Sequence, residues 1–186
     1  MKRHTFIGCF ACALGISTWS HGQATPTAAR VGSIQAGAGV MFTRPDYAQT
    51  YLKGVTFYGD YDFNNLGILK NHLGIEAEIH YSAITPQDIS ENTYLFGPRY
   101  TWRYKKLGIY GKALFGVGRF GFQQGSYANP QTGTYFAYGL GGGVEYKVTH
   151  KINIRGFDAE FQSWPGFPPH GLSPIVYTVG VAYVFR

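Results

Sequence analysis

The chain has 186 residues, of which 17% are aromatic, 26 are glycines and 14% are charged, with a formal net charge of +6. One domain is expected at this length, and a charged fraction well below the usual ~25% favours a sheet protein that faces something other than water. Its basic residues are scattered among strand-like segments, so a nucleic-acid-binding surface is not expected.

The first 24 residues have the organisation of a secretory signal peptide. Basic residues at the start precede an apolar run over 6–16, and small residues lead to Ala24. This pattern predicts that 1–24 is a cleaved signal peptide and that 25–186 form the mature domain. The alternative, a membrane-spanning helix, needs ~20 apolar residues, and the run is much shorter.

Both cysteines of the chain, Cys9 and Cys12, lie within this segment. The mature protein is therefore expected to have no disulfide, no thiolate nucleophile and no cysteine metal ligand. A lipid anchor on Cys12 is a further alternative, but the residues before it leave the apolar run unfinished.

Apolar and polar residues alternate over most of the remaining chain, as in strands with two unlike faces. Eight such segments occur, at 34–42, 55–63, 73–83, 94–104, 109–117, 136–146, 151–163 and 175–185. Longer connections at 43–50, 84–92, 121–133 and 162–174 alternate with shorter ones around 64–71, 105–106 and 149–150. An even strand number with long loops at one end and short turns at the other is typical of outer-membrane barrels. The pattern predicts an all-β, eight-stranded antiparallel up-and-down transmembrane β-barrel.

The segment 73–83, LGIEAEIHYSA, raises the question of which face meets water. Its apolar face, which includes Ile79, would point inward in a soluble barrel and toward lipid in a membrane barrel. Aromatic residues at both ends of the segments favour lipid, because they match the girdles at the two bilayer interfaces. The ring near the long loops is expected to contain Tyr51, Tyr81, Tyr94, Phe120, Tyr135 and Trp164. The ring near the short turns is expected to contain Tyr61, Tyr100, Trp102, Tyr104, Tyr146 and Tyr183.

Charged residues on the opposite face are sorted by strand, acids beside bases. An eight-stranded barrel is just wide enough to be filled by side chains, so a large pore is excluded and a structural charge network in the lumen is expected. Its members are Asp60, Asp62, Glu76, Glu78, Arg99, Arg103, Lys112, Glu145, Arg155, Asp158 and Glu160. Gly139, Gly141 and Gly143 either make room for arginine side chains to cross the lumen or leave a water-filled pocket.

Two positions depart from regular alternation. Pro98 removes a hydrogen-bond donor inside a strand of a closed barrel, which predicts a β-bulge at Gly97–Pro98. Alternation changes phase in 151–163, and Gly156 is the expected site of a second bulge that causes the switch.

The last segment ends Tyr177-Thr-Val-Gly-Val-Ala-Tyr-Val-Phe185-Arg186 and resembles the C-terminal assembly signal of outer-membrane barrels, with one residue beyond the usual aromatic end. Over 31–186 the chain resembles the small eight-stranded family typified by OmpX and the transmembrane part of OmpA. The resemblance implies a barrel in the cell outer membrane of a Gram-negative-type bacterium, and a monomer is expected. It also implies contact with outer-membrane lipid and lipopolysaccharide, and with the barrel-assembly machinery through the last strand.

Candidate catalytic and metal-binding groups are few. His80 and Ser82 superficially resemble the His-x-Ser of lipid A deacylases, but both fall on the lumen face, away from acyl chains. His170 and Ser173 lie in a loop at another spacing. His80 with Glu76 and Glu78 suggests a metal site, although membership in the charge network is the simpler interpretation. The glycines at 139–143 lack the Lys-Ser/Thr of a phosphate-binding loop.

We therefore expect no catalytic residue, no cofactor and no metal. The expected function is that of a non-enzymatic outer-membrane barrel with a structural or surface-interaction role, presenting loops 121–133 and 162–174 outside the cell. Two alternatives stay open: a lipid-A-modifying hydrolase or acyltransferase, and a soluble periplasmic barrel that binds a small apolar ligand.

Overall fold

The computed structural model describes residues 32–46, 50–63, 72–84, 89–122 and 133–185. The strands are β1 (Gly32–Arg44), β2 (Leu52–Phe63), β3 (Leu73–Ile84), β4 (Ile89–Tyr104), β5 (Leu107–Phe122), β6 (Gly133–Lys147), β7 (Ile152–Ser163) and β8 (Ile175–Phe185). The expected signal peptide and both cysteines lie outside the described residues. In the described part of the chain, no helix has the length and apolar character needed to cross a membrane.

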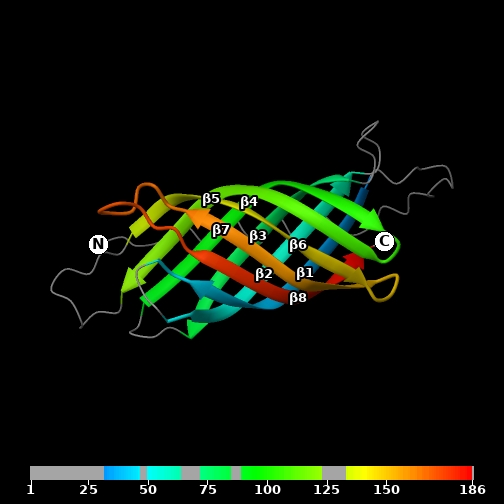
Figure 1. Ribbon diagram of the computed structural model, residues 1–186, viewed down its shortest axis with the longest axis horizontal. Helices are drawn as coiled ribbons and strands as arrows, with labels where there is room; N and C mark the ends of the chain where they lie inside the picture. The colour runs from blue at the N-terminus through cyan, green and yellow to red at the C-terminus, as the bar shows by residue number, and fades with distance from the viewer. Residues whose placement is uncertain (1–31, 47–49, 64–71, 85–88, 123–132, 186) are drawn as a thin grey trace, which may run out of the picture.

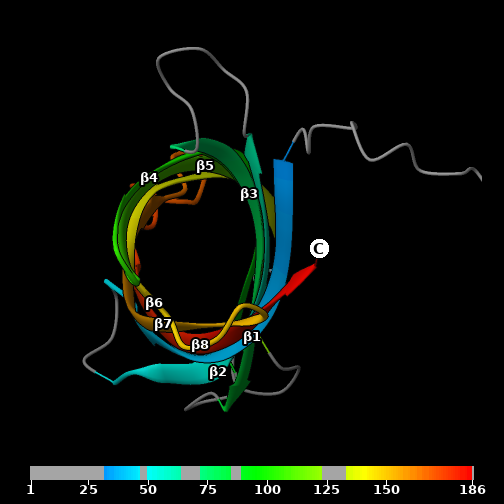
Figure 2. The ribbon, with the colours of Figure 1, turned by 90° about the vertical axis from the view of Figure 1, so that its right-hand side faces the viewer.

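Each strand pairs antiparallel with the next, and β8 closes the ring by pairing with β1 from Ile34↔Phe185 to Arg44↔Ile175. The strands run obliquely around the barrel (Figure 1), and the end-on view shows the closed ring (Figure 2). The predicted fold class is therefore confirmed.

The barrel is apolar outside and polar inside. In β3, Ile79 is 42% exposed, whereas its neighbour Glu78 is 1% exposed. The same division holds around the ring, with apolar side chains such as Phe57, Phe115 and Val181 exposed on the outer surface. An outward apolar band around a charged interior is the arrangement of a membrane barrel.

The two expected aromatic rings differ in outcome. At the turn end, Tyr100, Trp102, Tyr104, Tyr146 and Tyr183 are exposed on the outer surface, and Tyr61 is partly exposed there.

At the loop end, Tyr51, Tyr81 and Tyr94 are exposed as predicted. The assignment of Phe120 and Trp164 to this ring is wrong, because these side chains are 1% and 0% exposed and lie in an internal apolar cluster. Tyr135 packs against the same cluster.

The asymmetry of the connections is weaker than predicted. The β3–β4 connection spans only 85–88, because β4 begins earlier than its sequence pattern indicates, whereas β2 and β3 are separated by 64–72. The pair of residues 105–106 forms the tightest turn, in which Lys105 has a φ of 55°.

The bulge expected at Gly156 is confirmed. The register of β7 shifts against β6 between Val144 and Glu145, and against β8 between Arg155 and Asp158. Because the extra residue reverses the alternation, Arg155 and Asp158 both point into the lumen.

The bulge expected at Pro98 is wrong. Ile75↔Pro98 belongs to an unbroken register between β3 and β4. On the other side, pairing with β5 lapses at Gly97 and Pro98 and resumes at Arg99↔Lys112 without a shift. The missing proline donor is thus accommodated by a local gap in one ladder, with no inserted residue.

Closure predicts a property of the folded protein that a gel can measure. A barrel without a free edge resists unfolding in detergent, so the unheated protein is expected to migrate differently from the boiled protein. Sheet circular dichroism of the unheated sample provides the control that it is folded. Identical mobility of a folded and a boiled sample would contradict the closed barrel.

Candidate functional site: the charged lumen

Two arginines occupy the middle of the lumen. Arg155 on β7 places Nη1 2.8 Å from Glu76 and 2.5 Å from Glu78, both on β3. Arg99 on β4 places Nη1 2.7 Å from Asp60 on β2 and Nη2 2.8 Å from Glu145 on β6. Because their partners lie on other strands, these ion pairs join distant parts of the ring across its interior.

Lys112 on β5 lies among carboxylates of two other strands. Its Nζ is 2.5 Å from Glu78, 3.0 Å from Asp158 and 3.1 Å from Glu160. All four side chains are buried. An ammonium group with three donors can satisfy three acceptors at once, so this arrangement fits lysine well.

Two tyrosines complete the middle of the lumen. The Arg155 guanidinium lies 3.7 Å from the ring centre of Tyr58, and that of Arg99 lies 3.9 Å from the ring centre of Tyr110. The Tyr110 hydroxyl also donates a hydrogen bond to Asp158. Cation–π contacts of this kind are strongest where water is excluded. The inward parity of both tyrosines is visible in the sequence, but their role beneath the arginines is not.

The inner glycines of β6 make room for side chains, though not for the arginines that were expected. A Cβ on Gly139 would lie 2.9 Å from the Glu160 carboxyl carbon, and one on Gly143 would lie 2.6 Å from the Tyr110 hydroxyl. These glycines therefore allow bulky inner side chains to approach the backbone of β6.

The eleven residues named from the sequence all face the interior, and ten of them are buried. The exception is Arg103, whose side chain is 40% exposed while its Nη2 contacts Asp62 at 2.5 Å. Its pair lies at the turn end, beside a cavity of about 320 Å³. The residues that line this cavity include Lys105, Lys106, Lys147 and His150 as well as Asp62 and Glu145, so basic residues outnumber acidic ones at the turn end.

An apolar cluster covers the network at the loop end. Its buried members are Ile89, Leu95, Leu114, Phe120, Ala137, Trp164 and Leu172. Trp164 follows β7, and its backbone N–H donates to Leu172 O at 2.8 Å. The indole fits because position 118 is glycine: a Cβ there would lie 2.5 Å from the ring. The segment that holds Trp164 and Leu172 is thereby anchored to the mouth of the barrel.

The sequence matches the family model described as outer membrane protein beta-barrel domain over residues 9–185. The chain belongs to this family. It is an outer-membrane protein, and its strands cross the membrane.

Solved structures of outer-membrane proteins share the fold of this barrel. Neisserial surface protein A is similar with a TM-score of 0.60 and 15% identity, over 84% of this chain and 98% of that one. Ail of Yersinia pestis, in complex with the heparin analogue sucrose octasulfate, has a TM-score of 0.53 and 16% identity, over 83% and 97%. A major outer membrane protein of Thermus thermophilus has a TM-score of 0.51 and 10% identity, over 84% and 100%. None of the curated proteins compared with the chain matches it.

The candidate catalytic pair of this outer-membrane barrel is not assembled. Nδ1 of His80 lies 2.8 Å from Thr56 Oγ1, while the hydroxyl of Ser82 donates to the carbonyl of Glu91 at 2.5 Å. Both side chains are buried on the lumen side. Ser173, the loop alternative, contacts Asp46 through its backbone N–H at 2.8 Å. Within the described residues, no serine hydroxyl is hydrogen-bonded to a histidine.

Proposed function

We propose that the protein is a non-enzymatic outer-membrane barrel whose role is structural or is carried out by surface interactions of its loops. The observation that carries this proposal is the filled lumen. Ion pairs occupy its middle, and an apolar cluster covers it at the loop end. The parts accessible to a partner are then the outer surface and the segments at the two ends.

The segment from Trp164 to Leu172 has the properties of a presented surface. Its ends are joined by backbone hydrogen bonds, and Phe167 packs edge-on against Phe120 with ring centres 4.8 Å apart. Pro165, Pro168, Pro169 and His170 remain exposed. An anchored, proline-rich tip loses little conformational entropy when it binds, which favours recognition.

The filled lumen leads to an electrical prediction. Reconstituted in planar lipid bilayers, the protein is expected to give no steady channel, because ion-paired side chains occupy the middle of the lumen and the apolar cluster covers its loop end. The control is a large porin inserted under the same conditions, which must give stepwise conductance. Stable single-channel conductance steps from this protein would contradict the proposal, because they would require an open path through the lumen.

The competing enzymatic function is tested in cells. Lipid A from a deletion strain is expected to have the same mass spectrum as lipid A from the parent strain. A change in its acyl chains that is reversed by the wild-type gene, and not by a Ser82→Ala variant, would overturn the proposal.

Protease treatment of intact cells tests the loops separately, since cleavage between 164 and 172 is expected only if that end faces outward.

A further inference from the structure

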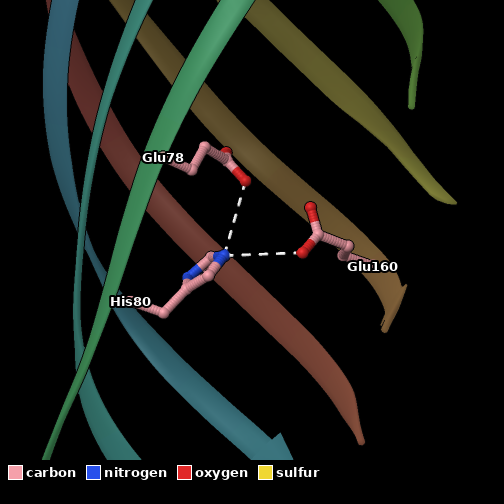
Figure 3. A group of neighbouring side chains, drawn as sticks. All are labelled: Glu78, His80 and Glu160. Carbon is pink, nitrogen blue, oxygen red and sulfur yellow. Dashed lines mark ion pairs between the residues drawn. The ribbon is translucent and has the colours of Figure 1, made fainter. Parts of the chain in front are cut away.

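Glu78 and His80 on β3 and Glu160 on β7 converge inside the lumen (Figure 3). Nε2 of His80 lies 3.5 Å from Glu78 Oε2 and 3.6 Å from Glu160 Oε1. The three side chains are buried, and their facing ligand atoms all lie within 4.8 Å of one another. Glu160 reaches this place because the bulge at Gly156 sets the parity of the second half of β7.

The imidazole is held with one nitrogen aimed at the carboxylates. His80 is 2% exposed, and its Nδ1 is 2.8 Å from Thr56 Oγ1. Nε2 is buried and makes no hydrogen bond among the described residues. Buried ring nitrogens are normally satisfied, and a hydrogen bond on the far nitrogen is the arrangement that orients a metal-binding histidine.

The two carboxylates are held by neighbouring donors, some of which contact the same oxygens that face His80. Arg155 holds Glu78 through Oε1 at 2.5 Å, while Lys112 contacts Oε2 of Glu78 at 2.5 Å and Oε2 of Glu160 at 3.1 Å. Gln162 donates to Oε1 of Glu160 at 2.8 Å. Because each carboxylate oxygen has two acceptor positions, the oxygens that face His80 retain one each.

The surrounding network has more negative than positive groups. Its seven buried acids are Asp60, Asp62, Glu76, Glu78, Glu145, Asp158 and Glu160, whereas its permanent cations are the buried Arg99, Lys112 and Arg155 and the partly exposed Arg103, which pairs with Asp62. Excess charge in a water-poor interior is costly unless it is neutralised. A bound divalent cation would offset most of this excess at the point where three ligand atoms already meet.

We propose that Glu78, His80 and Glu160 bind a divalent transition-metal ion within the lumen, with Zn²⁺ as the best fit. Zinc bonds of about 2.0–2.1 Å to imidazole and carboxylate imply ligand atoms about 3.3 Å apart in a tetrahedron. The 3.5 and 3.6 Å separations from Nε2 to the two carboxylate oxygens are close to that spacing, and those two oxygens, which lie within 4.8 Å of each other, would draw together on the metal. One nitrogen and two oxygen ligands suit zinc better than Ca²⁺ or Mg²⁺, which prefer all-oxygen sites.

The test measures metal retained by the refolded mature protein. The protein is refolded into detergent with Zn²⁺, passed over a desalting column in the presence of a weak chelator, and its zinc content is measured. Wild-type protein is expected to retain about one equivalent. His80→Gln and Glu160→Gln are expected to lose most of it, and the double variant His150→Gln/His170→Gln, which removes exposed imidazoles, is expected to retain it.

A second measurement decides the matter if the site variants do not fold, as judged by heat-dependent gel mobility. Wild-type protein refolded with Co²⁺ is expected to show the intense visible bands of a four-coordinate site, in which a water molecule is the fourth ligand beside the three side chains. The proposal would be overturned if the wild-type protein retained no metal, or if it showed only the weak spectrum of six-coordinate Co²⁺. A protonated His80 would then be the positive charge between Glu78 and Glu160. Zinc retention that is unchanged in folded His80→Gln would overturn the proposal equally.

Discussion

Replacing Arg155 with methionine is expected to lower the free energy of unfolding by about 3–5 kcal/mol, because it leaves buried carboxylates without their cation. The guanidinium contacts Glu76 at 2.8 Å and Glu78 at 2.5 Å, and its side chain is 0% exposed. Methionine keeps much of the volume, so the loss reports charge more than packing. Urea titration of the barrel in detergent, followed by circular dichroism, measures the change.

Two further variants separate this effect from a general intolerance of substitution. Arg103→Met removes a cation whose side chain is 40% exposed, and a loss of about 1 kcal/mol or less is expected because water can replace the lost partner. Adding Glu76→Gln to Arg155→Met is expected to restore part of the stability, since it removes one of the stranded charges. Equal unfolding free energies of wild type and Arg155→Met would show that the ion pairs of Arg155 contribute nothing to folding.

The members of the network could be predicted because strand alternation assigns each residue to one face. Which residues form ion pairs could not be predicted, because a contact such as that of Arg155 with Glu76 depends on the relative stagger of strands on opposite sides of the lumen. The same limit applies to the site around His80. Sequence proximity suggested Glu76 as a ligand beside Glu78, but the structure places Glu160 from β7 at the imidazole instead.

At the loop end, the aromatic residues were assigned to the outer ring because they lie near strand ends. Position near a strand end does not distinguish an aromatic side chain that faces lipid from one that closes the lumen. For Phe120 the parity shared with Lys112 was an available signal, because both lie at inward positions of β5. The same signal was available for Trp164, which continues the inward parity of Glu160 and Gln162, but its pairing with Leu172 is visible only in the folded segment.

Replacing Ile79 with arginine is expected to cost about 2–4 kcal/mol of folding stability, because the charge enters hydrocarbon near the middle of a membrane strand. Ile79 pairs with Phe57 on β2 and Tyr94 on β4, and its side chain is exposed on the apolar outer surface. The measurement is reversible unfolding in lipid vesicles. Tyr104→Arg, at the turn end of β4, is the matched control and is expected to cost no more than about 1 kcal/mol, because the added charge reaches the interface.

A large cost at Ile79 would also follow if that side chain lay in a dry protein core, so stability alone does not establish which face meets lipid. Spin labels on cysteines introduced at 79 and 78 distinguish the two arrangements in the same vesicles. Oxygen dissolves in the hydrocarbon, so it is expected to relax a label at 79 much more than one at 78, where the native glutamate is 1% exposed in the lumen. Stronger oxygen relaxation of the label at 78 than of the label at 79 would mean that Glu78 faces lipid and Ile79 faces the lumen. In that case the cost of Ile79→Arg would no longer reflect its depth in the membrane, and its difference from Tyr104→Arg would be expected to disappear.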